Sequence, residues 1–168
     1  MNDFSSIPAL PVAAREALRR LNNANAEATS HLEPAEWETL LAKAHLALAP
    51  VAADALLIAF SQDADYASPN FLWFAEQYER FLYVDRIVVV ERARGRGLAR
   101  ALYTALADAA RTAGLERIVC EVNRIPPTPG SDAFHARLGF QEVGRAHPYG
   151  DAKLVRYLAL ELEDAEPR

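Results

Sequence analysis

The chain has 168 residues, of which 51% are hydrophobic and 24% charged, with a formal net charge of −5 at pH 7. This length and composition predict one globular domain, residues 1–168, that buries its own core. The acidic balance argues against a nucleic-acid-binding protein, whose binding surface is usually basic. The single cysteine excludes an internal disulfide. No apolar run approaches a membrane span of roughly 20 residues and nothing resembles a signal peptide, so we expect a cytoplasmic protein that binds no membrane.

The first third of the chain predicts two helices. Met1 to Val12 is weakly patterned and is interpreted as an extended arm with no clear strand. Ala13 to Asn25 has helical spacing, and the asparagines at its end favour termination there. A second helix is expected from Pro34, which suits a first helical turn. Its apolar positions then recur at helical spacing: Trp37, Leu40, Leu41 and Ala44.

Two strands, a loop and an aromatic segment follow. His45 to Val51 and Ala55 to Ser61 predict a hairpin, because a short turn containing Pro50 and its neighbours separates two apolar runs. Gln62 to Asn70 is polar and predicts a loop. A dense set of aromatic residues comes next: Phe71, Trp73, Phe74 and Tyr78.

The stretch from Phe81 to Gly114 predicts a buried strand, a glycine-arginine turn and a long helix. Phe81 to Val90 is rich in β-branched and aromatic residues, which is typical of a strand covered on both faces. Apolar residues then recur at helical spacing from Leu98 to Ala113, and Gly114 stands where a C-terminal cap is expected.

The last third predicts three strands and one short helix. Ile118 to Asn123 alternates as a strand and leads into a proline-rich loop. Ser131 or Asp132 is the expected cap of a helix that ends near Leu138. The final strands are expected at Phe140 to Val143 and Leu154 to Leu162, before a charged tail, Glu163 to Arg168.

The turn Arg94-Gly95-Arg96-Gly97 has the chemistry of a phosphate site. Glycines let the backbone approach a ligand closely, and the following helix adds N–H groups and the positive end of its dipole. Arg92 and Arg100 add positive charge on either side. An ordinary strand–helix corner with solvated arginines is the alternative. A nucleoside-triphosphate loop with G-x-x-x-x-G-K-[ST] and a dinucleotide fingerprint with a third glycine are both absent from the sequence.

Two motifs resemble those of the GNAT superfamily of acyl-CoA N-acyltransferases. Arg94 to Ala99, RGRGLA, is similar to the family signature R/Q-x-x-G-x-G/A, after a valine-rich strand and before a helix. His135 to Phe140, HARLGF, is similar to the family ending Y-x-x-x-G-F, with histidine in place of tyrosine. The resemblance covers about half of the chain, Phe81 to Leu162. It implies an α+β fold: a mixed, mostly antiparallel sheet of six to seven strands, helices on both faces and a central splayed strand pair.

The resemblance also implies acetyl-CoA as acyl donor. The backbone of the turn would hold its pyrophosphate, through Arg94, Gly95, Arg96, Gly97, Leu98 and Ala99. The strand around Val88, Val89 and Val90 would lie along the pantetheine arm, with the Val89 N–H as oxyanion donor. Asn123, at the end of the next strand, would contact the same arm, although it could equally bond its own turn. No metal is expected.

His135 and Asp85 are the catalytic candidates. The family often has a tyrosine at the position of His135, aimed at the sulfur. An imidazolium there could also contact the donor and protonate the leaving thiolate. Carboxylates near Asp85 act as bases in several family members, and Glu121 is a weaker candidate. The alternatives are an exposed histidine, a thiolate that leaves unaided, and an aspartate paired with Arg86.

The acceptor site is expected at two places. In the family, the segment between the first two helices helps to shape it, and here that segment carries His31 and Glu33. The polar loop and the aromatic residues around the central strand are the second place, through Tyr66, Phe71, Trp73, Phe74 and Tyr83. Core packing is the alternative for at least two of these aromatic residues.

The function predicted is transfer of an acetyl group to a primary amine of a small molecule or an exposed amino group. The amine would attack directly in a ternary complex. The alternative is a non-catalytic acyl-CoA-binding module of the same fold. A nucleic-acid-binding role for the arginine turn is a third hypothesis, disfavoured by the acidic chain. A homodimer is left open.

Overall fold

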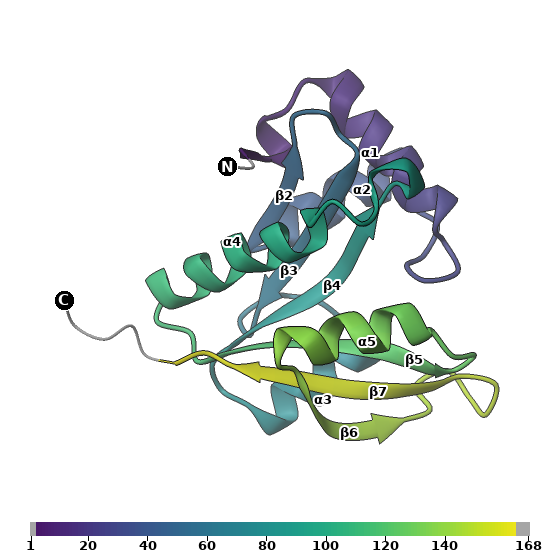
Figure 1. The fold of residues 1–168 in the computed structure, drawn as a ribbon, viewed down its shortest axis with the longest axis vertical. Helices are drawn as coiled ribbons and strands as arrows, with labels where there is room; N and C mark the ends of the chain where they lie inside the picture. The colour runs from purple at the N-terminus through teal and green to yellow at the C-terminus, as the bar shows by residue number, and fades with distance from the viewer. Residues whose placement is uncertain (1–2, 164–168) are drawn as a thin grey trace. The chain divides into compact units, whose positions relative to one another are not determined.

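The structure, a computed structural model, describes residues 3–163 and is drawn in Figure 1. The strands are β1 (Phe4–Ser6), β2 (Leu46–Pro50), β3 (Ala55–Ser61), β4 (Phe81–Val89), β5 (Arg117–Ile125), β6 (Gln141–Ala146) and β7 (Leu154–Glu161). The α-helices are α1 (Val12–Ala24), α2 (Pro34–Lys43), α3 (Pro69–Gln77), α4 (Leu98–Thr112) and α5 (Pro129–Leu138). Two short 3-10 helices are η1 (Ile7–Ala9) and η2 (Glu91–Ala93).

The strands form one mixed sheet in the order β1-β2-β3-β4-β5-β7-β6. β2 pairs antiparallel with β1 and with β3, and β7 pairs antiparallel with β5 and with β6. β4 pairs parallel with β5, joining Phe81–Tyr83 to Arg117–Val119. Parallel neighbours need a crossover connection, which here contains α4. The predicted hairpin and the α+β class are confirmed, whereas the splaying of β4 from β5 stays a prediction.

The chain forms two compact units, to which β4 and α4 each contribute residues. The first unit contains the residues up to Asp65 together with Val84–Leu106. Its core is centred on β3, where Ala55 to Phe60 are fully buried. A strand with no exposed residue needs cover on both faces. Figure 1 shows α2 behind these strands and the first half of α4 in front of them.

The second unit contains Tyr66–Tyr83 and the residues from Ala107 onward. Here α3 and α5 lie on opposite faces of the sheet (Figure 1). Trp73 on α3 stacks on Tyr157 of β7, with ring centroids 4.3 Å apart. At the end of α5, Gly139 has φ 97° and closes the helix in the left-handed region, as the L-G-F motif requires.

Two elements differ from the sequence prediction. β1 pairs Phe4, Ser5 and Ser6 with β2, so the N-terminal arm is a strand followed by a 3-10 turn. The aromatic segment is a helix, α3, where no helix was predicted. Pro69 stands in its first turn, as proline does in many helices, so the Ser68-Pro69 pair begins a helix rather than continuing the loop.

The remaining boundaries agree with the prediction to within a few residues. α1 ends at Ala24 beside the asparagines, and α2 begins at Pro34. The predicted cap of α5 is wrong, because the helix begins at Pro129 with Thr128 at the N-cap. The predicted charged tail lies, from residue 164 on, outside the described residues. Each helix of residues 3–163 is too short or too polar to cross a membrane.

Candidate active site

The turn between η2 and α4 has an uncommon backbone. Gly95 and Gly97 have φ of 75° and 79°, in the left-handed region that favours glycine. A Cβ built on either glycine would meet no atom within 4 Å, so open space and not internal crowding surrounds both positions. Alternating backbone conformations of this kind turn successive N–H groups toward one side and form an anion-binding concavity.

Most amides of this turn donate to no backbone carbonyl oxygen of the described turns and loops. Arg94 is the exception, because its N–H donates to the carbonyl oxygen of Glu91 over 3.1 Å. Within residues 3–163, the N–H groups of Gly95, Arg96 and Gly97 donate to no backbone carbonyl of the turns, loops or caps. The first N–H groups of α4 lack intrahelical acceptors, as in any α-helix. The donors that remain therefore run from Gly95 into the first turn of α4.

The arginines around the turn are exposed: Arg92, Arg94, Arg96 and Arg100. Arg94 reaches back along the chain, and its Nε donates to the carbonyl oxygen of Val89 over 3.2 Å. This contact ties the turn to the end of β4. The local positive charge, in a chain of net charge −5, would attract a small anion to the turn.

The end of β4 is partly committed to bonds within the protein. The N–H of Val90 donates to the carbonyl oxygen of Asp54 over 2.8 Å, and the carbonyl oxygen of Val90 accepts from Ala93 over 2.9 Å. Both backbone groups of Val90 therefore form a hydrogen bond within the protein, and the predicted contact of Val88, Val89 and Val90 with the pantetheine arm stays a prediction.

Asp85 on β4 forms a buried ion pair. Its Oδ2 lies 2.6 Å from the Nε of Arg86, and the two side chains are 6% and 5% exposed. Side chains of neighbouring strand residues point to opposite faces, so the long arginine side chain folds back to reach this carboxylate. Asp85 is thus paired with Arg86, the alternative that the sequence left open.

A second carboxylate, Glu121 on β5, has a different environment in the second unit. Its Oε2 accepts from the hydroxyl of Tyr83 over 2.8 Å, and its Oε1 accepts from Nδ2 of Asn70 over 3.2 Å. The Oδ1 of Asn70 accepts in turn from the hydroxyl of Tyr157 over 2.9 Å. Glu121 is half-buried, whereas Asn70, Tyr83 and Tyr157 are buried.

The hydrogen bonds from Tyr157 to Asn70 and from Asn70 to Glu121 all donate toward Glu121. Burial, with a smaller contribution from the Glu121 carboxylate, raises the pKa of Tyr157 to about 12. Tyr157 therefore keeps its proton and donates to Asn70, which fixes the amide so that its N–H faces Glu121. Neutral donors hold the carboxylate of Glu121, whereas a guanidinium holds that of Asp85.

His135 lies in the middle of α5 and is 4% exposed, so the predicted alternative of an exposed histidine is wrong. Its Nδ1 lies 2.8 Å from the carbonyl oxygen of Ser131, one turn earlier. A carbonyl oxygen only accepts, so Nδ1 carries the proton of the neutral ring. Burial lowers the pKa of His135 below its ordinary value, against smaller raising effects of the Ser131 carbonyl and Asp132. The ring is therefore neutral at pH 7, with its lone pair on Nε2.

Asn123 is half-buried near the end of β5, where the pairing with β7 shifts register. Its carbonyl oxygen accepts from the hydroxyl of Thr128 over 3.1 Å. This contact fixes the loop between β5 and α5 through the main chain of Asn123. The predicted contact of Asn123 with a pantetheine arm stays a prediction.

The five aromatic residues predicted for the acceptor pocket divide into two groups. Phe71, Phe74 and Tyr83 are at most 2% exposed and pack in one cluster, as the core-packing alternative requires. Tyr66 and Trp73 are half-buried. Tyr66 contacts Phe71 edge-on, with ring centroids 5.7 Å apart. Only Tyr66 and Trp73 therefore have accessible surface of any size for an acceptor.

Residues 68–140 match the sequence family described as the Acetyltransferase (GNAT) family. The matched segment contains both motifs, from the turn at Gly95 to the L-G-F ending. The match spans 73 of the 168 residues, so this segment of the chain is similar to the GNAT acetyltransferases. Such enzymes are acyltransferases that use acetyl-CoA as their acyl donor. No match to a curated protein sequence was found.

Solved structures with the same fold cover nearly the whole chain. The ribosomal-protein-S18-alanine N-acetyltransferase from Escherichia coli is 19% identical with a TM-score of 0.63, over 98% of this chain and 96% of that one. A GNAT acetyltransferase from Streptococcus pneumoniae is 16% identical with a TM-score of 0.69, over 97% and 100%. An aminoglycoside 6′-N-acetyltransferase complexed with coenzyme A is 15% identical with a TM-score of 0.70, over 99% and 98%. At these identities the likeness shows the fold.

The turn fits the diphosphate of acetyl-CoA. The test is steric and electrostatic: both glycines face open space, and the N–H groups from Gly95 to Gly97 are not consumed by the backbone of the described turns. Exposed arginines surround the same turn. Within residues 3–163, no group of three or more His, Cys, Asp or Glu side chains lies together in a way that could hold a metal ion.

The polar network around Glu121 and the buried partners of Arg86 were not predicted from the sequence. Asn70 was assigned to a polar loop, and Asn22 only to the end of a helix. One signal was present in the sequence. Arg86 and Glu121 are charged residues within largely apolar strand segments, and charged residues are almost never fully buried unless paired.

Proposed function

We propose that this chain transfers an acetyl group from acetyl-CoA to a primary amine, by direct attack of the amine within a ternary complex. The observation that carries the proposal is the turn at Gly95 and Gly97: two left-handed glycines in open space, directly before the N-terminus of α4. Its amides and arginines would hold the pyrophosphate. When bound, acetyl-CoA supplies a thioester whose carbonyl carbon accepts the amine nitrogen as the carbon–sulfur bond breaks.

Val88 and Val89 would place the pantetheine arm, and the Val89 N–H would stabilise the oxyanion. Arg94 supports this role, because its contact with the Val89 carbonyl fixes the backbone at the end of β4. One well-placed oxyanion donor lowers the barrier by about 3–4 kcal/mol in other enzymes. Leu98 and Ala99, in the first turn of α4, would add donor contacts within the first unit, and the contact of Asn123 with the pantetheine arm stays a prediction.

The attacking amine must lose a proton, and we propose that Glu121 receives it. The hydroxyl of Tyr83 and the amide of Asn70 orient the carboxylate, and neither group carries a charge. Asp85 is the other candidate. Its carboxylate is 6% exposed and lies 2.6 Å from the Nε of Arg86, so one of its oxygen atoms is already engaged by a guanidinium. The contacts therefore favour Glu121 as base, and leave Asp85 the partner of Arg86.

His135 was predicted to protonate the leaving thiolate. Its neutral ring already donates its N–H to Ser131, and its lowered pKa makes the imidazolium a minor species at pH 7. These contacts favour departure of the thiolate without a proton from His135. His135 then contacts the donor as a neutral group, with Nε2 as hydrogen-bond acceptor.

The acceptor class stays open between proteins and small molecules. By their names, the neighbours from the fold comparison include enzymes for a ribosomal protein's alanine and for aminoglycosides, and both present an amine. We propose two separate places for acceptor contact: Tyr66 and Trp73 in the second unit, and, in the first unit, the segment between α1 and α2 with exposed His31 and Glu33.

A turnover screen tests the proposal. Acetyl-CoA and longer acyl-CoAs are incubated with spermidine, tyramine, lysine and peptides with a free N-terminal alanine, and coenzyme A release is followed. We expect steady release with at least one amine. Binding of acetyl-CoA without turnover on a broad panel would contradict the proposal.

The second candidate is a non-catalytic acyl-CoA-binding module. The neutral state of His135, where the family often has a tyrosine, is the observation that favours it. Substituting His135 with tyrosine separates the two. A catalytic chain is expected to keep its turnover, whereas a module that lost its proton donor would gain turnover. A cytoplasmic location and a homodimer stay predictions.

A further inference from the structure

A buried arginine connects β4 to the segment between α1 and α2, here called the α1–α2 loop (residues 25–33). The guanidinium of Arg86 donates from Nε to Asp85, from Nη1 to Oδ1 of Asn22 over 2.9 Å, and from Nη2 to Oγ of Ser30 over 3.4 Å. These partners come from the strand itself, from the last turns of α1 and from the loop. The side chain of Arg86 is 5% exposed, so these hydrogen bonds are shielded from solvent.

Asn22 is the central partner and is fully buried. Its Oδ1 faces Arg86, which only donates, and its Nδ2 donates to the carbonyl oxygen of Ser30 over 2.8 Å. The amide orientation is therefore fixed from both sides. Ser30 is therefore held twice: Asn22 contacts its carbonyl oxygen, and Arg86 contacts its hydroxyl oxygen.

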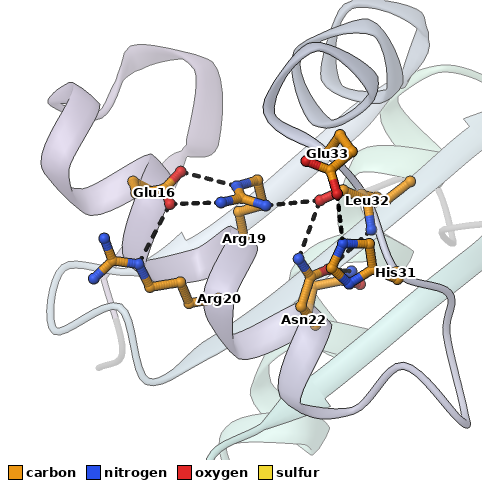
Figure 2. Close-up of polar contacts among 8 residues, drawn as sticks. Glu16, Arg19, Arg20, Asn22, His31, Leu32 and Glu33 are labelled. Atoms are coloured by element: carbon orange, nitrogen blue, oxygen red, sulfur yellow. Dashed lines mark hydrogen bonds and ion pairs between the residues drawn. The ribbon is translucent and has the colours of Figure 1, made fainter.

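The rest of the loop is held by side chains of α1. Asn23 pairs with the backbone of Leu32 in both directions, with its Oδ1 accepting from the N–H over 2.9 Å and its Nδ2 donating to the carbonyl over 3.0 Å. Figure 2 shows Arg19 between the carboxylate of Glu16 and the carbonyl oxygen of Leu32. The asparagines thus stand where the helix ends, and their side chains form hydrogen bonds with loop backbone groups that would otherwise bond to water.

The loop ends with two exposed polar side chains. His31 and Glu33 are 61% and 68% exposed, and their Nε2 and Oε1 atoms lie 2.9 Å apart (Figure 2). A connection that presents polar groups to solvent does not by itself need a buried guanidinium beneath it. A buried charge is expensive and contributes little net stability, so its use here indicates that the position of the loop matters.

We propose that Arg86 is a positioning residue for the acceptor site: it holds the α1–α2 loop against β4 through Asn22 and Ser30, with Asp85 as its counter-ion. The proposal rests on the proposed function, because it takes this loop as a wall of the acceptor site. Arg86 itself touches neither substrate. Loss of its contacts changes how the acceptor binds and leaves acetyl-CoA binding unchanged.

Hydrogen–deuterium exchange tests the coupling without any substrate. The full chain is compared with Arg86→Lys, which keeps the charge but cannot reach three partners at once, and with Ser30→Ala, which removes one partner. Arg20→Lys on the exposed side of α1 is the matched control. We expect exchange in residues 25–33 to speed up by about tenfold in Arg86→Lys and less in Ser30→Ala, with no change in the control.

Kinetics test the link to the acceptor. With whichever of spermidine, tyramine or the alanine peptide turns over, Arg86→Lys should raise the acceptor KM by about tenfold and the acetyl-CoA KM by less than about twofold. A general loss of structure would raise both. If Arg86→Lys does not fold, Ser30→Ala is used instead. It should raise the acceptor KM more than the acetyl-CoA KM, by a smaller factor than Arg86→Lys.

Two results overturn the proposal: unchanged exchange of residues 25–33 in Arg86→Lys and Ser30→Ala, or equal changes in the two KM values. If the wild-type chain turns over no amine, the proposed function fails, and so does the acceptor role given to Arg86. The exchange data would then still show whether Arg86 holds the loop, so the two failures are distinguishable.

Discussion

The Nδ1–H of His135 donates a hydrogen bond to the carbonyl oxygen of Ser131, one turn earlier in α5, over 2.8 Å. This bond fixes the tautomer of a buried imidazole and leaves Nε2 as an acceptor. Burial lowers the pKa of His135, so this histidine, which the sequence predicted as a catalytic group, is neutral near pH 7.

The first prediction is a pH dependence of stability. The pKa of His135 is lowered in the folded chain, so below pH of about 6.5 the unfolded chain takes up a proton that the folded chain does not. The contribution of His135 to the free energy of unfolding is fully present above that pH. It is lost as the pH drops, by at most about 1.4 kcal/mol per pH unit for one proton. Urea unfolding between pH 7.5 and 5 should show a shallower dependence in His135→Gln.

His147 provides the control for that experiment, because its ring is exposed in the turn after β6. His147→Gln is measured under the same conditions, so that the removal of an exposed histidine is compared with the removal of the buried one. A His135→Gln curve parallel to the wild-type curve across this range would contradict the assigned burial and tautomer.

The second prediction separates the two carboxylates. Asp85→Asn removes the counter-ion of a buried guanidinium and should cost about 3–5 kcal/mol of unfolding free energy. Glu121→Gln keeps the shape of a half-buried side chain but removes the proposed base, so kcat should fall by about 10²-fold or more. Chemical denaturation and steady-state kinetics on both variants measure this.

The reverse pattern would contradict the assignment of the base. If Asp85→Asn stays as stable as the wild type but loses turnover, while Glu121→Gln keeps its kcat, Asp85 is the base and Glu121 a structural group.

The third prediction concerns the aromatic stack. A Cβ at Gly144 would lie 2.5 Å from Cζ2 of Trp73, whose ring is stacked on Tyr157. Gly144→Ala should therefore push Trp73 off Tyr157 and destabilise the fold by about 1–3 kcal/mol. Unfolding curves, with tryptophan fluorescence as the probe, measure both effects.

Gly130 is the matched position, because it stands in α5 and a Cβ there would meet nothing within 4 Å. Gly130→Ala should be neutral or stabilise slightly, since alanine is the better helix former. Equal stability of the two alanine variants would contradict this prediction, because it would show that Trp73 can adopt another conformation at no cost in unfolding free energy.

The sequence predicted the strand, turn and helix from Phe81 to Thr112 because each element there has its own local signal. Periodicity and glycine chemistry act over a few residues, and they agree with each other in this stretch. β1 was missed because three residues carry no periodic pattern, and only pairing with β2 defines them.

The rest of the site depends on contacts between distant residues. Arg86 meets Asn22 across 64 positions, and Tyr157 meets Asn70 across 87. No local pattern contains these partners. α3 was missed for a different reason: Ser68-Pro69 is a loop signal in a sequence, but a proline in the first helical turn begins a helix equally well.

The most direct test of the central claim is acetyl-CoA binding to Gly97→Val and Gly150→Val, followed by thermal shift and calorimetry. Both glycines have positive φ, of 79° and 93°, and face open space, so both variants carry the same kind of backbone strain. We predict that acetyl-CoA stabilises the wild type and Gly150→Val, and that it no longer stabilises Gly97→Val. Undiminished stabilisation of Gly97→Val would contradict the placement of the donor's diphosphate in this turn.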